Sequence, residues 1–295
     1  MKLVAKCPLK LILFGEHSVL IGSRCVSLCI NRYAELYLSN IHNESICIRV
    51  QDKDNQGFYL NLVRNSLSIA KESSVTANDT GTIRIKYSLA CGLGSSAAVS
   101  LLSSVAVSKI NKAGDIKKIE DIYEQADKFE NIFHGKSSGV DCATIRTGGL
   151  ISFKKGDVES IDTVYLNTYK ILIYNSRISK DTMKTVNQTL KNKKENYEKL
   201  ARISEEAYHM LNRNFDLKEF YYLVRRAEDI FEDLNVVPDI MKKEVRNLRK
   251  LGIESKITGA GNGGHLFTLV GKEFDVESLK GWQCVDIDVN GLVIN

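Results

Sequence analysis

The chain has 295 residues, 43% of them hydrophobic and 26% charged, so it can bury one large or two compact cores, and extended disorder is excluded. Its net charge of +5 suits a small anionic ligand and falls short of the basic stripe of a nucleic-acid binder. Seven scattered cysteines include no CxxC pair, which argues against a zinc cluster or a disulfide framework. The sequence has no signal-peptide pattern and no apolar run of membrane-spanning length, so we expect a cytoplasmic protein without nucleic-acid or membrane partners.

The first third of the chain is rich in strand patterns. An apolar run ends at Gly15, as a strand does before a turn, and two later segments alternate apolar and polar residues. Strands are expected at residues 9–14, 26–40, 46–50 and 82–87. Residues 31–32 are a candidate break in the second of these strands, and residues 60–71 favour a helix.

A glycine-rich loop precedes an alanine-rich helical pattern. Gly92 and Gly94 lead into Ser95 and Ser96, and serine is a common residue at the start of a helix. The unpaired N–H groups of a first helical turn, together with the helix dipole, favour a phosphate at this position. A glycine-punctuated helix start in any α/β protein would give the same pattern, so both interpretations remain open at this point.

The next predicted helix, residues 117–134, places a carboxylate on its apolar side. Glu130 follows Ala126 by four residues, which puts both on one stripe of the helix. A buried carboxylate is costly unless it is paired or binds a metal ion, although an edge position reaching water would avoid that cost. The glycine- and serine-rich loop at residues 135–144 follows and contains Asp141.

The second half of the chain contains another strand–helix set and a third glycine cluster. A strand is expected at residues 170–175, helices at 181–214 and 217–234, and a glycine loop at 258–264 before a strand at 265–270. Strands and helices interleave without a regular βαβ rhythm, which favours the α+β class. We expect two domains, residues 1–164 and 165–295.

The glycine loops match neither of the common nucleotide motifs. No GxxxxGK[ST] sequence is present, and Ala97 stands where a GxGxxG fingerprint needs its last glycine. Instead, residues 9–22, 92–98 and 256–264 resemble, in order and spacing, the three motifs of the GHMP small-molecule kinases. Residues 130–141, read together with the Gly-Glu-His sequence that begins at Gly15, are most similar to the mevalonate kinase family of that superfamily.

This resemblance implies a fold of two lobes and an activity. The N-terminal lobe would be of the ribosomal protein S5 domain 2 type, the C-terminal lobe would be ferredoxin-like, and ATP would lie between them. The implied reaction is ATP-dependent phosphorylation of mevalonate to 5-phosphomevalonate, a step of isoprenoid biosynthesis. Two alternatives remain: another GHMP kinase acting on phosphomevalonate, homoserine or a sugar, and a non-catalytic nucleotide or metabolite sensor of the same fold.

The resemblance also assigns residues to the nucleotide and to a Mg²⁺ cofactor. Ser96 and Glu130 match the family's Mg²⁺ ligands, and hydroxyl and carboxylate oxygens are what this hard cation binds. The ATP phosphates are expected to contact Gly92, Leu93, Gly94, Ser95, Ser96 and Ala97 from the first loop, and Gly259, Ala260 and Gly261 from the third motif.

On the acceptor side the resemblance points to two catalytic residues and a substrate-binding turn. Asp141 matches the residue that takes the proton of the acceptor hydroxyl, with Lys10 beside it, and both would also bind the substrate. Lys10 could equally stabilise the developing alkoxide while Asp141 only orients the hydroxyl. Glu16 and His17 are expected near the substrate. In isolation Lys10 would be read as a solvated lysine, Asp141 as a helix cap and His17 as a structural turn residue.

Departures from the family pattern remove no charged or metal-binding position and bear mainly on which alcohol is accepted. Leu9 stands where a glycine is usual before the lysine, and Asn262 replaces a glycine in the third motif. Asparagine tolerates positive φ better than most residues, so this change is mild. His265 is interpreted as structural, and a homodimer is compatible with the sequence.

Overall fold

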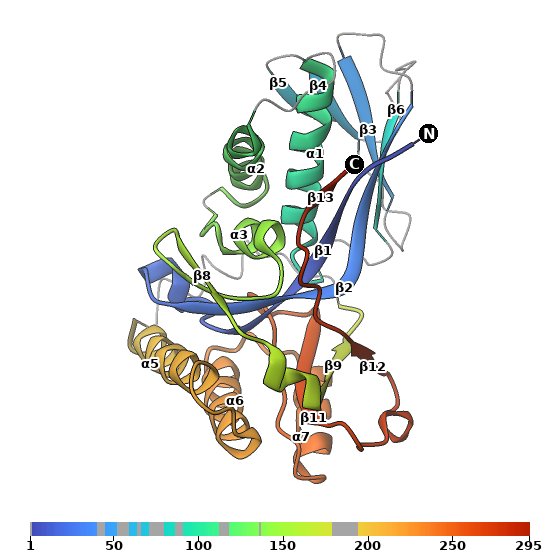
Figure 1. Ribbon diagram of the computed structural model, residues 1–295. Helices are drawn as coiled ribbons and strands as arrows, with labels where there is room; N and C mark the ends of the chain where they lie inside the picture. The colour runs from blue at the N-terminus through green and yellow to red at the C-terminus, as the bar shows by residue number, and fades with distance from the viewer. Residues whose placement is uncertain are drawn as a thin grey trace.

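The computed structural model describes residues 2–39, 45–51, 59–63, 66–70, 80–85, 91–111, 118–135, 137–178 and 194–295. Within these residues the strands form two main sheets, one of nine strands and one of four. Each sheet carries helices, and the two sets make an upper and a lower lobe in Figure 1. The predicted α+β class is confirmed.

The large sheet contains the strands of the N-terminal half and one short strand from the end of the chain. These are β1 (Lys2–Phe14), β2 (Cys25–Leu38), β3 (Ser45–Gln51), β4 (Tyr59–Val63), β5 (Ser66–Ala70), β6 (Thr80–Ile85), β7 (Leu150–Lys154), β8 (Asp157–Ile161) and β13 (Val293–Ile294). The order is β13-β1-β2-β6-β3-β4-β5, and β7 and β8 extend the sheet beside β2. Only β3 and β6 pair in parallel among these described strands.

The pairing of β1 with β2 contains an irregularity. The register shifts between Pro8, which lies opposite Tyr33, and Leu9, which lies opposite Ile30. Residues 31–32 are therefore extra on β2 and form a bulge, so the candidate break is an irregularity within one continuous strand. Pro8 suits this place because it has no N–H group to give to the ladder.

Three helices cover the large sheet, namely α1 (Ser95–Asn111), α2 (Ile119–His134) and α3 (Val140–Thr147). Helix α1 packs against β1 and β2 on one side and against α2 on the other (Figure 1). Residues 97–107 are buried without interruption, because a helix covered on both sides needs apolar or small residues all round.

The small sheet has the order β10-β11-β9-β12, and all its pairs are antiparallel. Its strands and helices are β9 (Tyr169–Asn175), α5 (Lys194–Leu211), α6 (Leu217–Asp233), α7 (Asp239–Arg249), β10 (Lys256–Ile257), β11 (His265–Gly271) and β12 (Trp282–Val285). The predicted strand at 170–175 and the helix at 217–234 are confirmed. Of the predicted helix at 181–214, residues 194–211 are helical and 181–193 lie outside the described residues.

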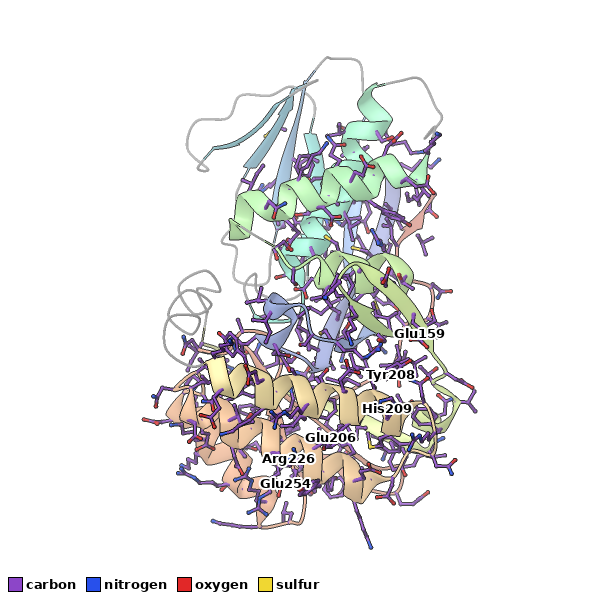
Figure 2. All side chains as sticks on the ribbon, turned by 90° about the vertical axis from the view of Figure 1, so that its left-hand side faces the viewer. Glu159, Glu206, Tyr208, His209, Arg226 and Glu254 are labelled. Atoms are coloured by element: carbon purple, nitrogen blue, oxygen red, sulfur yellow. The ribbon has the colours of Figure 1, made fainter. Side chains whose placement is uncertain are left out.

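Helix α5 fastens the lower lobe to the upper one. The Ser204 hydroxyl donates to the Arg24 carbonyl at 2.7 Å, and Arg24 Nε lies 2.9 Å from Glu205 Oε2. Farther along the same helix, the Tyr208 hydroxyl donates to Glu159 of β8 (Figure 2). These contacts join α5 of the lower lobe to the start of β2 and to β8 of the upper lobe.

Among the described residues, the chain passes between the lobes after β8 and again before β13. The connection from β8 to β9 contains a 3-10 turn, Val164–Thr168, and the expected domain division after residue 164 falls within it. That division stays a prediction, because the last strand, β13, returns to the large sheet and pairs with β1. No helix of the described residues is both long and apolar enough to cross a membrane.

The helix predicted at residues 60–71 is wrong. In the described part of this segment β4 and β5 form an antiparallel hairpin, with Val63 opposite Ser66. The apolar residues of both strands in fact recur every second position, at Leu60 and Leu62 and again at Leu67 and Ile69. That period fits a strand, and pairing with β3 and β5 overrides the helical propensity of short leucine-containing runs.

Candidate active site

Strand β1 supplies the lysine around which the site is built. Lys10 is 1% exposed, and its main-chain N–H donates to the Leu93 carbonyl of the glycine loop at 2.9 Å. Its ammonium Nζ lies 2.9 Å from Asp141 Oδ1. Lys10, from residues 9–22, thus contacts two other segments that carry the resemblance, residues 92–98 and residues 130–141.

Asp141 sits at the start of α3, where a carboxylate is favoured. It is the second residue of the helix, after Gly139, whose φ of 81° is accessible mainly to glycine. The helix dipole stabilises a negative charge in this first turn. The Asp141 side chain is 27% exposed while that of Lys10 is 2% exposed, so the carboxylate is the accessible member of the pair.

Glu130 lies on α2 and is buried, as the helical pattern predicted. The pKa of Glu130 is raised to about 7, mainly by burial and in part by the nearby Asp141, while hydrogen bonds from Ser96 and Ser100 act in the opposite direction. The Ser100 hydroxyl lies 3.4 Å from Glu130 Oε1. A divalent cation would favour the ionised form of this buried carboxylate. The oxygens of Glu130 and Ser96 are of the kind that Mg²⁺ binds, so these residues fit Mg²⁺.

The anion site is predicted at the glycine loop and the N-terminus of α1. Gly92 and Gly94 both have positive φ, 86° and 72°, and Ser95 is the first residue of the helix. The Ala98 N–H donates to the Gly94 carbonyl at 3.0 Å, which closes the first turn. The N–H groups of residues 95–97 have no carbonyl four residues earlier within the helix. Donors in this position are suited to bind phosphate oxygens.

The third glycine motif is fastened directly to β1. The Ile12 N–H donates to Thr258 Oγ1 at 2.9 Å, and the Thr258 hydroxyl lies 3.2 Å from the Ile12 carbonyl. Gly259 and Gly261 have positive φ, and so does Asn262, at 57°. Asn262 thus adopts the positive φ that asparagine was expected to tolerate.

A second connection links this motif to the first glycine loop. His265, at the start of β11, lies with Nδ1 2.9 Å from the Cys91 carbonyl, directly before Gly92. His265 is buried, in agreement with its structural interpretation. The contact between His265 and Cys91 was not predicted from the sequence. The only signal for it is the position of His265 at the end of the third glycine cluster.

Glu16 and His17 lie in a turn directly after β1, and both are buried. Glu16 pairs with Lys256, a residue to which sequence reasoning gave no role. The His17 ring lies 5.8 Å from both the Tyr197 and the Phe231 rings, measured between centroids. Their predicted contacts with a substrate therefore stay predictions.

Comparison with known proteins finds similarity to the GHMP kinases, the same family that the sequence motifs resemble. Residues 61–149 match the family described as GHMP kinases N terminal domain. Mevalonate kinase of Methanocaldococcus jannaschii is 27% identical over 310 residues, covering 97% of this chain and 98% of that protein. Mevalonate kinase of Thermococcus sibiricus is 28% identical over 308 residues, covering 91% of this chain and 89% of the relative.

Solved structures show a shared fold. The crystal structure of the Methanococcus jannaschii mevalonate kinase superimposes with a TM-score of 0.73 at 22% identity, covering 97% of this chain and 98% of that one. Lactococcus lactis galactokinase, complexed with galactose, reaches the same TM-score of 0.73 at 14% identity, covering 100% and 95%. The two-lobed arrangement is thus common to kinases with different acceptors.

Proposed function

We propose that this chain, which resembles the GHMP kinases and mevalonate kinase most of all, transfers the γ-phosphoryl group of ATP to mevalonate. The product would be 5-phosphomevalonate, an intermediate for isoprenoid synthesis. The observation that carries the proposal is the Lys10–Asp141 pair, 2.9 Å between Nζ and Oδ1, beside a glycine loop that opens a long helix.

The chemistry follows from what phosphoryl transfer requires. Positioning and charge neutralisation dominate, because the transferred group passes through a loose, charged transition state. The acceptor oxygen forms a bond to the γ-phosphorus, the bond from that phosphorus to the β–γ bridging oxygen breaks, and ADP leaves. Asp141 would accept the hydroxyl proton, and the Lys10 ammonium would stabilise negative charge between the acceptor and the phosphate.

The remaining predicted residues divide between the two substrates. N–H groups of residues 92–97 and of 259–261 would hold the phosphates. Ser96 and Glu130 would hold Mg²⁺, which neutralises phosphate charge when bound. Glu16 and His17 would shape the acceptor side. We also propose the domain division 1–164 and 165–295 and action in the cytoplasm, and a homodimer remains a prediction.

The acceptor is the least constrained part of this proposal. The curated relatives matched over nearly the whole chain are named mevalonate kinase, which favours mevalonate. Galactokinase shares the fold equally well, so a different alcohol is the second candidate. Both candidates use the same Lys10–Asp141 chemistry and differ only in what fits beside it.

An ADP-release assay with MgATP and a panel of mevalonate, phosphomevalonate, homoserine and galactose tests the acceptor. We expect turnover of mevalonate at an ordinary kinase rate of ~1–100 s⁻¹. The Lys10→Met variant, purified identically, controls for a contaminating kinase. If mevalonate is not phosphorylated and another alcohol of the panel clearly is, mevalonate is rejected as the acceptor and that alcohol takes its place.

A further inference from the structure

Lys256 and Glu16 form a buried ion pair across the boundary of the two lobes. Glu16 follows β1 of the large sheet, and Lys256 begins β10 of the small sheet. The Lys256 ammonium contacts Glu16 Oε1, and the side chains are 0% and 1% exposed. The two residues are 240 positions apart, so docking of the lobes brings them together.

Three phenylalanine rings enclose the ammonium. Nζ of Lys256 lies 5.7 Å from the centroid of Phe14, 5.3 Å from that of Phe231 and 5.0 Å from that of Phe267. An ammonium within about 6 Å of an aromatic face is attracted to it. Phe14 belongs to β1 and the other two rings belong to α6 and β11, so both lobes build the enclosure.

A second carboxylate stands close to the pair. Glu228 of α6 is fully buried, and its Oε2 accepts a hydrogen bond from the Ile257 N–H at 2.9 Å. Burial raises the pKa of Glu228 to about 8, with Lys256 acting in the opposite direction. At neutral pH Glu228 is therefore mainly protonated. The Lys256 ammonium makes its direct contact with Glu16, and burial raises the pKa of Glu16 while Lys256 acts in the opposite direction.

An ion pair buried this deeply needs an explanation other than stability. The free-energy cost of desolvating two charges offsets most of the free energy of their attraction. Proteins in which such a pair is replaced by apolar side chains are often as stable or more stable. The place of the pair offers that explanation. The Val19 N–H donates to the Gly15 carbonyl at 3.0 Å and the Ser18 N–H to the Glu16 carbonyl at 2.6 Å, so an anchored Glu16 fixes the whole turn.

We propose that Lys256 is a positioning residue, which holds the turn of residues 15–17 at the acceptor side of the site through its contact with Glu16. The Lys256 ammonium is held by the Glu16 carboxylate, by the Ile257 carbonyl at 2.8 Å and among three phenylalanine rings, so we assign it a role through Glu16 and not on a substrate. This inference rests on the proposed function, because that function assigns the turn to the acceptor alcohol.

The nucleotide side has separate attachments. The Lys256 ammonium also donates to the Ile257 carbonyl at 2.8 Å, but the next residue, Thr258, is held by its own two hydrogen bonds to Ile12. The glycine loop is held by the Lys10 N–H on the Leu93 carbonyl, 2.9 Å, and by His265 on the Cys91 carbonyl, 2.9 Å. Neither contact involves Lys256 or Glu16. Loss of the Lys256 charge should therefore weaken use of the alcohol while leaving use of ATP nearly unchanged, which a general loss of structure would not do.

Steady-state kinetics of Lys256→Gln test this selectivity. We expect kcat/KM for the alcohol to fall at least tenfold and the KM for ATP to stay within about twofold of wild type. Arg226→Met is the matched control, since it removes the half-exposed ion pair with Glu206 between α5 and α6 in the same lobe (Figure 2). This control should keep both constants.

A readout without catalysis accompanies the kinetics. Hydrogen–deuterium exchange at the amides of Ser18 and Val19 should speed up in Lys256→Gln, because the turn loses its anchor, while exchange in α1 stays as in wild type. If the single variant does not fold, the double variant Glu16→Met/Lys256→Met replaces the pair with apolar side chains of similar length and should fold.

Several outcomes would overturn the inference. They are kinetic constants of Lys256→Gln within threefold of wild type, an equal loss on ATP and alcohol, unchanged exchange in the turn, or a folded double variant with wild-type kcat/KM. A wild-type protein inactive on the whole alcohol panel would instead reject the proposed function. Exchange would then still show whether Lys256 holds the turn.

Discussion

Gly94 and Lys10 are fitted to each other so closely that no side chain can stand between them. A Cβ at position 94 would lie 2.8 Å from both Cγ and Cε of Lys10, closer than real carbon contacts allow. Gly94 also has a φ of 72°, a conformation that costs other residues about 1–2 kcal/mol. The glycine loop can therefore approach the lysine only because position 94 is glycine.

Gly94→Ala should reduce kcat at least ~10²-fold, because the new methyl group must displace either Lys10 or the loop, and misplacement by about 1 Å is enough for such a loss. The loss should appear in kcat with saturating substrates, in protein that is folded by circular dichroism. The matched control is Gly156→Ala, in the turn between β7 and β8. There φ is +97° and no atom lies within 4 Å of the added Cβ.

The control separates backbone strain from the collision with Lys10. Gly156→Ala should lose about 1–2 kcal/mol of unfolding free energy and keep its kcat. Equal losses of kcat in the two alanine variants would mean that strain alone, and not the position of Lys10, explains the result.

The Mg²⁺ assignment predicts a shift in metal dependence. Ser96→Ala and Glu130→Gln should each raise the Mg²⁺ concentration for half-maximal rate about tenfold or more, the loss typical when a group at a metal site is removed. Ser104→Ala is the control, because its hydroxyl, on the same helix, bonds to the Ser100 carbonyl at 2.9 Å. A folded Glu130→Gln variant with an unchanged Mg²⁺ titration would assign Glu130 a structural role.

Much of the site could be predicted because its signals are local. Glycine at positions 92 and 94 predicts positive φ, and the apolar stripe that contains Glu130 predicts a buried carboxylate. Asparagine at position 262 predicts that a positive φ is tolerated there. Each of these depends on a short segment and on rules of helix or turn geometry.

The remainder depends on contacts that no short segment encodes. Ile12 and Thr258 are 246 positions apart, so their hydrogen bonds exist only in the docked lobes. The partner of Glu16 was missed for the same reason. The helix expected at residues 60–71 failed differently, since its two-residue period was present but pairing with neighbouring strands decides such short apolar runs.

Glu228 predicts how stability depends on pH. Its pKa is raised from 4.5 to about 8 by burial, so the folded state holds a proton that the unfolded state releases above pH 4.5. This contribution to stability is present at low pH and is lost as pH rises from about 4.5 to 8, by at most about 1.4 kcal/mol per pH unit.

Glu228→Gln removes that titration while its amide oxygen can still accept the Ile257 N–H. Urea unfolding at pH 5.5, 6.5 and 7.5 should show a variant whose stability falls less steeply with pH than that of wild type. The exposed Glu219, on the same helix, provides the control Glu219→Gln, which should keep the wild-type slope. Parallel curves for Glu228→Gln and wild type would mean that Glu228 is ionised in the folded protein.

The Lys10–Asp141 pair gives the most direct prediction about catalysis. Asp141→Asn keeps the size of the side chain but cannot take a proton, so kcat should fall ~10²–10⁴-fold while MgATP affinity stays nearly intact. Lys10→Met should also lower kcat, because charge on the transferred group is no longer balanced. Since the two side chains lie 2.9 Å apart and act together, the double variant should lose less than the product of the single losses.

Single-turnover phosphoryl transfer in wild type, both single variants and the double variant measures this coupling, with nucleotide affinity determined separately. A fall of only a few-fold in Asp141→Asn would remove the proton-acceptor role, because a positioned base contributes far more than that. Lys10 would then stabilise the alkoxide itself, and Asp141 would orient the hydroxyl and the ammonium. Full multiplicativity of the two losses would show instead that lysine and aspartate act on separate features of the transition state, despite their contact.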